Sequence, residues 1–161
     1  MSKIELLEKK DIEKAIEIFK RAYLPLNVPE DEEDWFVNDI QNSFGSATNI
    51  QFYKITDSEE IICFGAVEKL NFTRGAYALR WGTTEPKFQN KGLMTLLTKH
   101  RVHAIEREVE DISGSIQIMA RRPSLYKKLG FKELYTRKGE NKATHMFKII
   151  NPELVESYCL S

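Results

Sequence analysis

The feature that most restricts the fold is a strand pattern followed by one long helix pattern and then another strand pattern. A long strand is expected over residues 76–84, after Gly75 and before Glu85-Pro86. A long helix is expected over residues 90–109, and the side chains near one of its faces are Leu93, Leu96, Leu97, His100, Ala104 and Ile105. Strand character returns over residues 115–120, after Gly114. A helix that connects two strands in this way predicts a crossover in which the strands are parallel and the connection is right-handed.

The other patterns surround this crossover with antiparallel strands. Asp11 is the expected N-cap of the first helix, and Trp35, Phe36 and Ile40 form the expected apolar face of the second. The order predicts an α+β (α/β) fold, with a mixed and mostly antiparallel sheet of six to seven strands and about four helices. Further strands are expected over 3–7, 49–55, 61–70, 132–137 and 143–150, and further helices over 11–23, 30–43 and 123–129.

Length and composition narrow the class of protein. A chain of 161 residues without repeats or Gly/Ser linkers predicts a single domain over residues 1–161. The 24 basic and 24 acidic side chains balance, which argues against a dedicated nucleic-acid binder. The apolar run Ile61–Val67 is too short to span a membrane, and the first ten residues lack the apolar core of a signal peptide. Cys63 and Cys159 make no disulfide framework, so we expect a cytoplasmic protein.

The junction between the strand and the long helix is the main candidate for chemistry. It reads Thr84-Glu85-Pro86-Lys87-Phe88-Gln89-Asn90-Lys91-Gly92-Leu93-Met94. A helix start presents amides without intrahelical acceptors and the positive end of the helix dipole, which together suit a phosphate group. Gly92 has no Cβ and lets an anion approach the chain, although a glycine here is equally simple punctuation between two elements. The chain has neither a Walker sequence nor a Gly-x-Gly pair, which excludes a P-loop and a dinucleotide fingerprint.

A second segment follows the next strand and reads Ser124-Leu125-Tyr126-Lys127-Lys128-Leu129-Gly130-Phe131. Together with Gln89-x-x-Gly92, it resembles the GNAT superfamily of N-acetyltransferases. The order of expected elements resembles that family over nearly the whole chain. The resemblance implies one parallel strand pair splayed around acetyl-CoA, which acts as co-substrate, and a reaction that needs no metal.

The resemblance also implies which residues bind acetyl-CoA. Main-chain groups of Gly82, Thr83 and Thr84 would align the pantetheine arm. Tyr126 matches the tyrosine that faces the thioester sulfur and donates a proton to the leaving thiolate. Met94 stands where the family usually has Gly or Ala, so its side chain must turn away from the cofactor. The pyrophosphate would be bound by amides of Gln89, Asn90, Lys91, Gly92, Leu93 and Met94.

The group that removes the proton from the amine is not where many GNAT members place it. The strand over residues 76–84 contains no Asp or Glu. An amine with a pKa near 10.4 is almost fully protonated at neutral pH, so some group must deprotonate it. Glu68 and Glu85 are the nearest carboxylates in the sequence and are the candidate general bases, although each is equally a charge at a strand end. Arg80 either holds an anionic substrate or lies on a solvated face.

Two stretches of like charge bear on the partner. Residues 28–60 hold nine acids and one base, and residues 121–142 hold eight bases and two acids. In the GNAT family the acidic region helps to form the acceptor pocket, where acids would concentrate cations such as polyamines or lysine-bearing peptides. The same acids also stabilise a helix N-terminus. His100 and His103 lie three residues apart on one helix but have no evident third ligand, so we expect no metal site.

The leading hypothesis is an acetyl-CoA-dependent N-acetyltransferase in which a primary amine attacks the bound thioester directly. The alternative is a GNAT-fold module that binds acyl-CoA or a partner without turnover, which the missing strand carboxylate and Met94 favour. A third reading is nucleic-acid association through the basic stretch. The sequence leaves open whether the acceptor is a small molecule or a protein amine, which acyl group is transferred, and whether the protein is a monomer or a homodimer.

Overall fold

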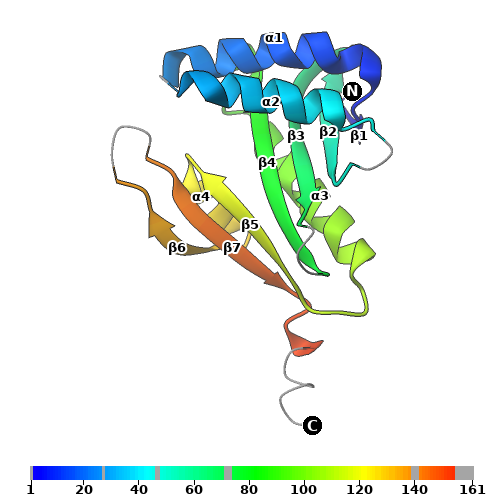
Figure 1. Cartoon of the computed structure of the whole chain (residues 1–161), viewed down its shortest axis with the longest axis vertical. Coiled ribbons are helices and arrows are strands. Elements are labelled where there is room, and N and C mark those ends of the chain that lie inside the picture. The colour runs from blue at the N-terminus through cyan, green and yellow to red at the C-terminus, as the bar shows by residue number, and fades with distance from the viewer. Residues whose placement is uncertain (1, 27, 46–47, 71–73, 139–141, 155–161) are drawn as a thin grey trace. The chain divides into compact units, whose positions relative to one another are not determined.

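A computed structural model describes residues 2–26, 28–45, 48–70, 74–138 and 142–154 (Figure 1). Its elements follow the predicted order. The strands are β1 (Lys3–Leu6), β2 (Ile50–Asp57), β3 (Glu60–Lys69), β4 (Ala76–Thr84), β5 (Gly114–Ala120), β6 (Lys132–Thr136) and β7 (Thr144–Ile150). The α-helices are α1 (Ile12–Tyr23), α2 (Glu30–Asn42), α3 (Leu93–Glu108) and α4 (Pro123–Lys128).

The strands form one seven-stranded sheet in the order β1-β2-β3-β4-β5-β7-β6. The crossover through α3 joins a parallel pair, as predicted: Ala76 to Ala78 of β4 pair with Ser115 to Gln117 of β5. Strand β7 lies antiparallel between β5 and β6, and β1 pairs antiparallel with β2. The predicted mixed and mostly antiparallel sheet is therefore confirmed.

The chain forms two compact units. Unit 1 comprises Met1–Val67 and Trp81–Thr98, and unit 2 comprises Glu68–Arg80 and Lys99–Ser161. Unit 1 contains nine basic and fifteen acidic residues, and unit 2 contains fifteen basic and nine acidic residues. The neutral total thus conceals net charges of −6 and +6. The single domain over residues 1–161 stays a prediction.

Aromatic side chains dominate one core cluster of unit 1, where α1 and α2 run side by side (Figure 1). Phe19 of α1 stacks on Tyr23 and on Phe36 of α2, with both centroid separations at 4.2 Å. Phe36 and Ile40 are fully buried, as predicted, but Trp35 is 56% exposed. The prediction for Trp35 was wrong because its neighbour Phe36 faces the strands, which turns Trp35 outward.

A second cluster of unit 1 includes the start of α3. Ile55, Ile62, Cys63 and Leu97 are buried together, with Phe88, Leu93 and Met94 packed against them. Cys63 is therefore the small core residue that the sequence suggested, whereas Cys159 lies outside the described residues. This cluster anchors the first turn of α3 to β2 and β3.

The buried face of α3 agrees with the predicted one only in part. Leu96, which belongs to the first turns of α3 in unit 1, is 47% exposed, and in unit 2 Val102, Ile105 and the fully buried Arg101 face inward. The Arg101 Nη1 donates to the carbonyl oxygen of Arg80 at 3.3 Å. Leu97 and Ile105 belong to the predicted face and are buried. Arg101 joins them although a periodicity pattern counts arginine as polar, so the apolar stripe alone does not identify the whole buried face.

Candidate functional site

Strand β4 departs from regular geometry at Trp81. The φ angle of Trp81 is +56°, a left-handed conformation that costs a residue with a side chain about 1–3 kcal/mol. Its indole Nε1 donates to Asp39 Oδ2 at 2.7 Å, and its ring packs edge-on against Phe19 and Phe36. These contacts offset the cost and fix the direction of the following peptide groups. Sequence reasoning missed this feature, although Gly82 inside a strand pattern is a recognised signal of a bulge.

The end of β4 is held by internal contacts of unit 1. The Tyr23 hydroxyl donates to the carbonyl oxygen of Gly82 at 3.4 Å, and the Thr83 hydroxyl donates to the carbonyl oxygen of Trp81 at 3.0 Å. The Thr84 Oγ1 lies 3.3 Å from the Cys63 sulfur. Both threonine hydroxyls therefore make contacts within unit 1.

The loop between β4 and α3 uses two left-handed residues. A short turn over Pro86–Phe88 comes first, and the Gln89 side chain then reaches back to the carbonyl oxygen of Thr84 at 3.5 Å. Asn90 and Gly92 follow with φ angles of +61° and +76°. The helix therefore starts at Leu93, whereas the periodicity had predicted a start at Asn90.

Gly92 borders open space at the start of α3. A Cβ placed on Gly92 would meet no described atom within 4 Å. The first intrahelical bond runs from the Leu96 amide to the carbonyl oxygen of Gly92 at 3.0 Å, so the amides before Leu96 have no intrahelical acceptor in this helix of sixteen residues. The Met94 side chain packs into the second cluster of unit 1, away from that space. Open space, helix amides and the positive dipole end together fit an anionic group such as a pyrophosphate.

Tyr126 lies in α4 of unit 2 and is 7% exposed. Its carbonyl oxygen accepts from the amides of Leu129 and Phe131, both at 3.0 Å. Its ring meets the Phe131 ring edge-on, with the centroids 5.7 Å apart. Gly130, between them, has a φ angle of +87°. The motif from Tyr126 to Phe131 is thus a closed turn that fixes the tyrosine backbone.

Both candidate bases carry an arginine partner. Glu85 in unit 1 accepts from Arg21 through both carboxylate oxygens, at 2.6 Å and 3.3 Å, and this hydrogen bonding raises the pKa of the Arg21 guanidinium. Glu68 in unit 2 accepts from Arg80 Nη1 at 3.1 Å through one oxygen, Oε2. Arg80 therefore pairs with a carboxylate of its own unit, an interaction that neither sequence interpretation of Arg80 had included.

The histidines contact nearby polar groups. The His103 Nδ1 lies 3.6 Å from Glu106 Oε2, and the His145 Nε2 lies 3.2 Å from Gln117 Oε1. Burial lowers the pKa of His100, and the nearby Arg107 and His103 lower it further. Within the described ranges, no group of three or more His, Cys, Asp or Glu side chains is arranged to hold a metal ion. Nor does any helix in those ranges combine the length and the apolar character needed to cross a membrane.

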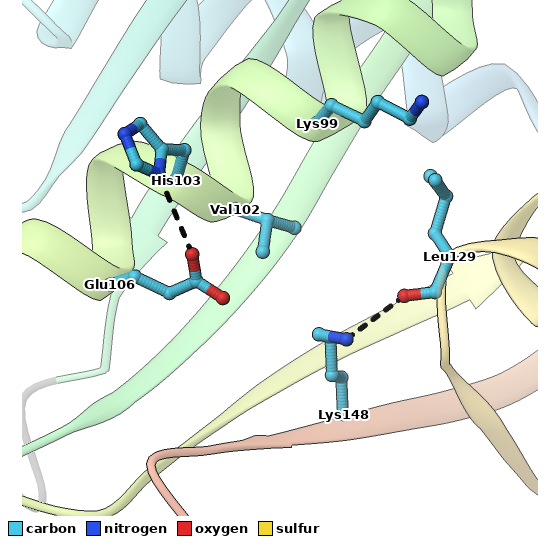
Figure 2. Close-up of a pocket in the computed structure, with 6 residues that line it drawn as sticks. All are labelled: Lys99, Val102, His103, Glu106, Leu129 and Lys148. Carbon is cyan, nitrogen blue, oxygen red and sulfur yellow. Dashed lines mark hydrogen bonds and ion pairs between the residues drawn. The ribbon is translucent and has the colours of Figure 1, made fainter.

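Unit 2 contains a cavity of about 370 Å³ between α3, the end of α4 and β7 (Figure 2). None of the residues that the sequence nominated for the site lines it. In Figure 2, the Lys148 ammonium reaches the carbonyl oxygen of Leu129, at 3.0 Å. The cavity is lined by Lys99, Val102, His103, Glu106, Leu129 and Lys148.

The chain is similar to known proteins in its three-dimensional structure. No protein-family model and no curated protein sequence matches the chain. The ribosomal-protein-S18-alanine N-acetyltransferase of Escherichia coli is similar, with a TM-score of 0.69, 19% identity and 93% of each chain covered. A GNAT-family acetyltransferase from Staphylococcus aureus Mu50 has a TM-score of 0.75 at 12% identity, covering 94% of this chain and 100% of that one. The PaiA N-acetyltransferase of Thermoplasma acidophilum, solved in complex with coenzyme A, has a TM-score of 0.69 at 17% identity, covering 92% and 98%.

At these identities the similarity is one of fold. The seven-stranded sheet, its single parallel pair of β4 and β5 and its four helices match the fold of those acetyltransferases. The resemblance carried by Gln89-x-x-Gly92 and by the segment from Tyr126 to Phe131 is confirmed at that level. This chain has the fold of the GNAT superfamily of acetyltransferases.

Proposed function

We propose that the protein is an acetyl-CoA-dependent N-acetyltransferase that acetylates a primary amine. The observation that carries the proposal is the start of α3, where Gly92 borders open space at the positive end of a helix sixteen residues long, in a chain with the GNAT fold. PaiA, a structure with the same fold, was solved in complex with coenzyme A, which supports the choice of co-substrate. The S18-alanine enzyme, named as an N-acetyltransferase, supports an amine acceptor.

Acetyl-CoA supplies an acetyl group that is already activated as a thioester. The amides at the start of α3, from Asn90 to Met94, bind its pyrophosphate, and the main chain of Gly82, Thr83 and Thr84 aligns its pantetheine arm. The fixed backbone at Trp81 makes this alignment rigid. The Gln89 amide, which the sequence had included, already donates to the carbonyl oxygen of Pro86 at 3.2 Å. Binding both substrates in line removes much of the entropic part of the barrier, an effect that reaches about 7–11 kcal/mol in well-oriented reactions.

The transfer itself is a direct displacement that conserves protons. The amine nitrogen forms a bond to the acetyl carbon, and the carbon–sulfur bond breaks. A carboxylate takes one proton from the ammonium before the attack, and the Tyr126 hydroxyl gives its proton to the leaving thiolate. The second nitrogen proton, lost as the amide forms, returns to the tyrosine through solvent. A phenol has an ordinary pKa of about 10 and a thiol one of about 8.5, so the contribution of Tyr126 depends on its position more than on its acidity.

Of the two candidate general bases, Glu68 has the carboxylate that is less engaged by its arginine partner. Both carboxylate oxygens of Glu85 accept hydrogen bonds from Arg21, so protonation of Glu85 would break a bidentate ion pair. Glu68 uses only Oε2 for Arg80, and within the described residues its other oxygen has no partner. Glu68 therefore takes the amine proton, directly or through a water molecule, while Glu85 stabilises the end of β4 against α1.

The acceptor that fits the charge distribution is a cationic amine. Unit 1 has a net charge of −6, and Asp31 and Asp34 of α2 are exposed. A negative surface raises the local concentration of cations and speeds their encounter with the protein. Polyamines, protein lysines and protein N-termini all share this chemistry.

A coupled assay tests the function. The purified protein is incubated with acetyl-CoA and a panel of amines, and release of free thiol is followed. We expect thiol release with at least one cationic amine, together with a mass increase of one acetyl group on that amine. The second candidate function is a binding module without turnover, favoured by the arginine partners of both carboxylates. Tight acetyl-CoA binding with no thiol release from any acceptor would support that alternative.

A further inference from the structure

Helix α4 is too short to be stable alone. It spans only Pro123–Lys128, and isolated helices shorter than about 12–15 residues are marginal in water. Its N-cap residue, Arg122, makes no side-chain cap hydrogen bond. The position of Tyr126 within this helix must therefore be fixed by contacts from outside it.

Lys148 supplies such a contact at the C-terminal end of α4. Its Nζ donates to the carbonyl oxygen of Leu129 at 3.0 Å, across nineteen residues of sequence (Figure 2). A cation beside the last carbonyls of a helix satisfies an acceptor that the helix leaves open and matches the negative end of its dipole. Lys148 sits on β7 opposite Ile116 of β5, so the side chain projects from the central strand of three.

Gly130 makes room for this ammonium group. A Cβ on Gly130 would lie 2.7 Å from Lys148 Nζ, closer than real Cβ atoms approach other atoms. The φ angle of +87° gives a second reason for glycine at this position. The close fit shows that the lysine contact is packed against the backbone of the turn after α4.

The carbonyl group that accepts from Lys148 belongs to Leu129, which is itself hydrogen-bonded to Tyr126. The Leu129 amide donates to the carbonyl oxygen of Tyr126, and Phe131, two residues later, donates to the same oxygen, both at 3.0 Å. The edge-on contact between the Tyr126 and Phe131 rings completes the turn. A continuous set of contacts thus runs from the sheet through Lys148 and Leu129 to Tyr126.

From these contacts we infer that Lys148 is a positioning residue that holds Tyr126 in place for proton donation. The inference rests on the proposed function, because it assigns the purpose of the contact to the acid role of Tyr126. Lys148 touches no reacting atom in this account. It acts by restricting motion of the turn after α4, which keeps the Tyr126 hydroxyl close to the departing sulfur.

Amide hydrogen exchange tests the contact without any substrate. In Lys148→Met, we expect the amides of Leu129 and Phe131 to exchange about tenfold faster, because the turn opens more often. Lys148→Arg keeps a cation and should restore most of the protection. Lys128→Met is the matched control, because the exposed side chain of Lys128 makes no hydrogen bond or ion pair within the described residues. Unchanged exchange in Lys148→Met would overturn the inference.

A double-mutant cycle tests the purpose. We expect Lys148→Met to lower kcat about tenfold and to leave the KM for acetyl-CoA within about twofold, because it displaces a group that acts after binding. In the Tyr126→Phe background the same substitution should change kcat less than about twofold, since the hydroxyl that it positions is gone. An equal loss of kcat in both backgrounds would make Lys148 merely structural and overturn the inference.

The two experiments separate this inference from the proposed function. If the wild-type protein neither binds acetyl-CoA nor releases thiol, the proposed function is wrong, and so is the role of Lys148 in positioning Tyr126 for proton donation. The exchange rates of Leu129 and Phe131 would still report whether Lys148 holds the turn. If the enzyme is active and Lys148→Met keeps the wild-type kcat, only the role of Lys148 is lost.

Discussion

Tyr126 makes two backbone hydrogen bonds and a ring contact that a phenylalanine at this position would keep. In Tyr126→Phe the carbonyl still accepts from Leu129 and Phe131, and the edge-on ring contact remains. We expect kcat to fall at least about tenfold, because the thiolate loses its proton donor, while calorimetry finds acetyl-CoA affinity within about twofold. A wild-type kcat in this variant would deny Tyr126 the acid role.

The two carboxylates separate in the same kind of experiment. We expect Glu68→Gln to lower kcat more than about tenfold with little change in thermal stability, since it removes the proton acceptor. Glu85→Gln should keep kcat within about threefold and lower the unfolding free energy by about 1 kcal/mol or less, because its partner Arg21 is 46% exposed and solvent screens the pair. Arg21→Gln is the matched control for Glu85→Gln and should match its stability loss. If Glu85→Gln reduces kcat strongly and Arg21→Gln does not, Glu85 and not Glu68 is the base.

Several residue-scale features depend on contacts that no local pattern encodes. Trp81 adopts its left-handed conformation because Asp39, 42 residues away, accepts its indole proton. Nothing in the sequence distinguishes Lys148 from the other basic residues, and only the fold places its ammonium group beside the carbonyl oxygen of Leu129. The assignments of Gln89, Gly92 and Tyr126, by contrast, came from short motifs that are visible in the sequence.

At the scale of elements, periodicity and punctuation were sufficient for most boundaries. Strand β4 has the predicted bounds, because a β-rich run is closed by Glu85-Pro86. Helix α3 starts three residues later than predicted, because Asn90 and Gly92 are left-handed and only the fold determines that. Its buried face was predicted in part: Leu97 and Ile105 are buried, but so is Arg101, which no apolar pattern indicates. Local patterns thus identify elements well and identify their faces less well where a charged residue is internal.

Helix α3 also carries a pH dependence through His100. Burial, Arg107 and His103 lower the pKa of His100 below its ordinary value of 6.5. The unfolded chain therefore binds a proton more readily than the folded chain as the pH falls below about 6.5, and stability is lost over that range. We expect the urea midpoint to fall between pH 7.5 and pH 5.5, and to fall less in His100→Gln. An equal pH dependence in wild type and His100→Gln would contradict this account.

At the scale of the whole molecule, the balanced net charge is a sum of two opposite ones. The acidic excess of unit 1 predicts that cationic acceptors are drawn electrostatically. We expect kcat/KM for a polyamine to fall several-fold between 0.01 M and 0.5 M salt, because the Debye length shrinks from about 30 Å to a few Å. The double variant Asp31→Asn, Asp34→Asn should weaken this dependence, and Glu59→Gln, also in unit 1, should not. A salt-independent kcat/KM would exclude electrostatic recruitment of the acceptor.

The central claim is that acetyl-CoA binds through its pyrophosphate at the start of α3, and calorimetric titration of two Gly92 variants tests it most directly. Gly92→Gln and Gly92→Glu share their shape and the strain of a positive φ, and both side chains enter open space. They differ by one negative charge. We predict that wild type binds acetyl-CoA, that Gly92→Gln binds more weakly, and that Gly92→Glu binds at least about tenfold more weakly than Gly92→Gln, because its carboxylate repels the pyrophosphate. Equal affinities in all three proteins, or no binding by the wild type at millimolar concentration, would contradict the account.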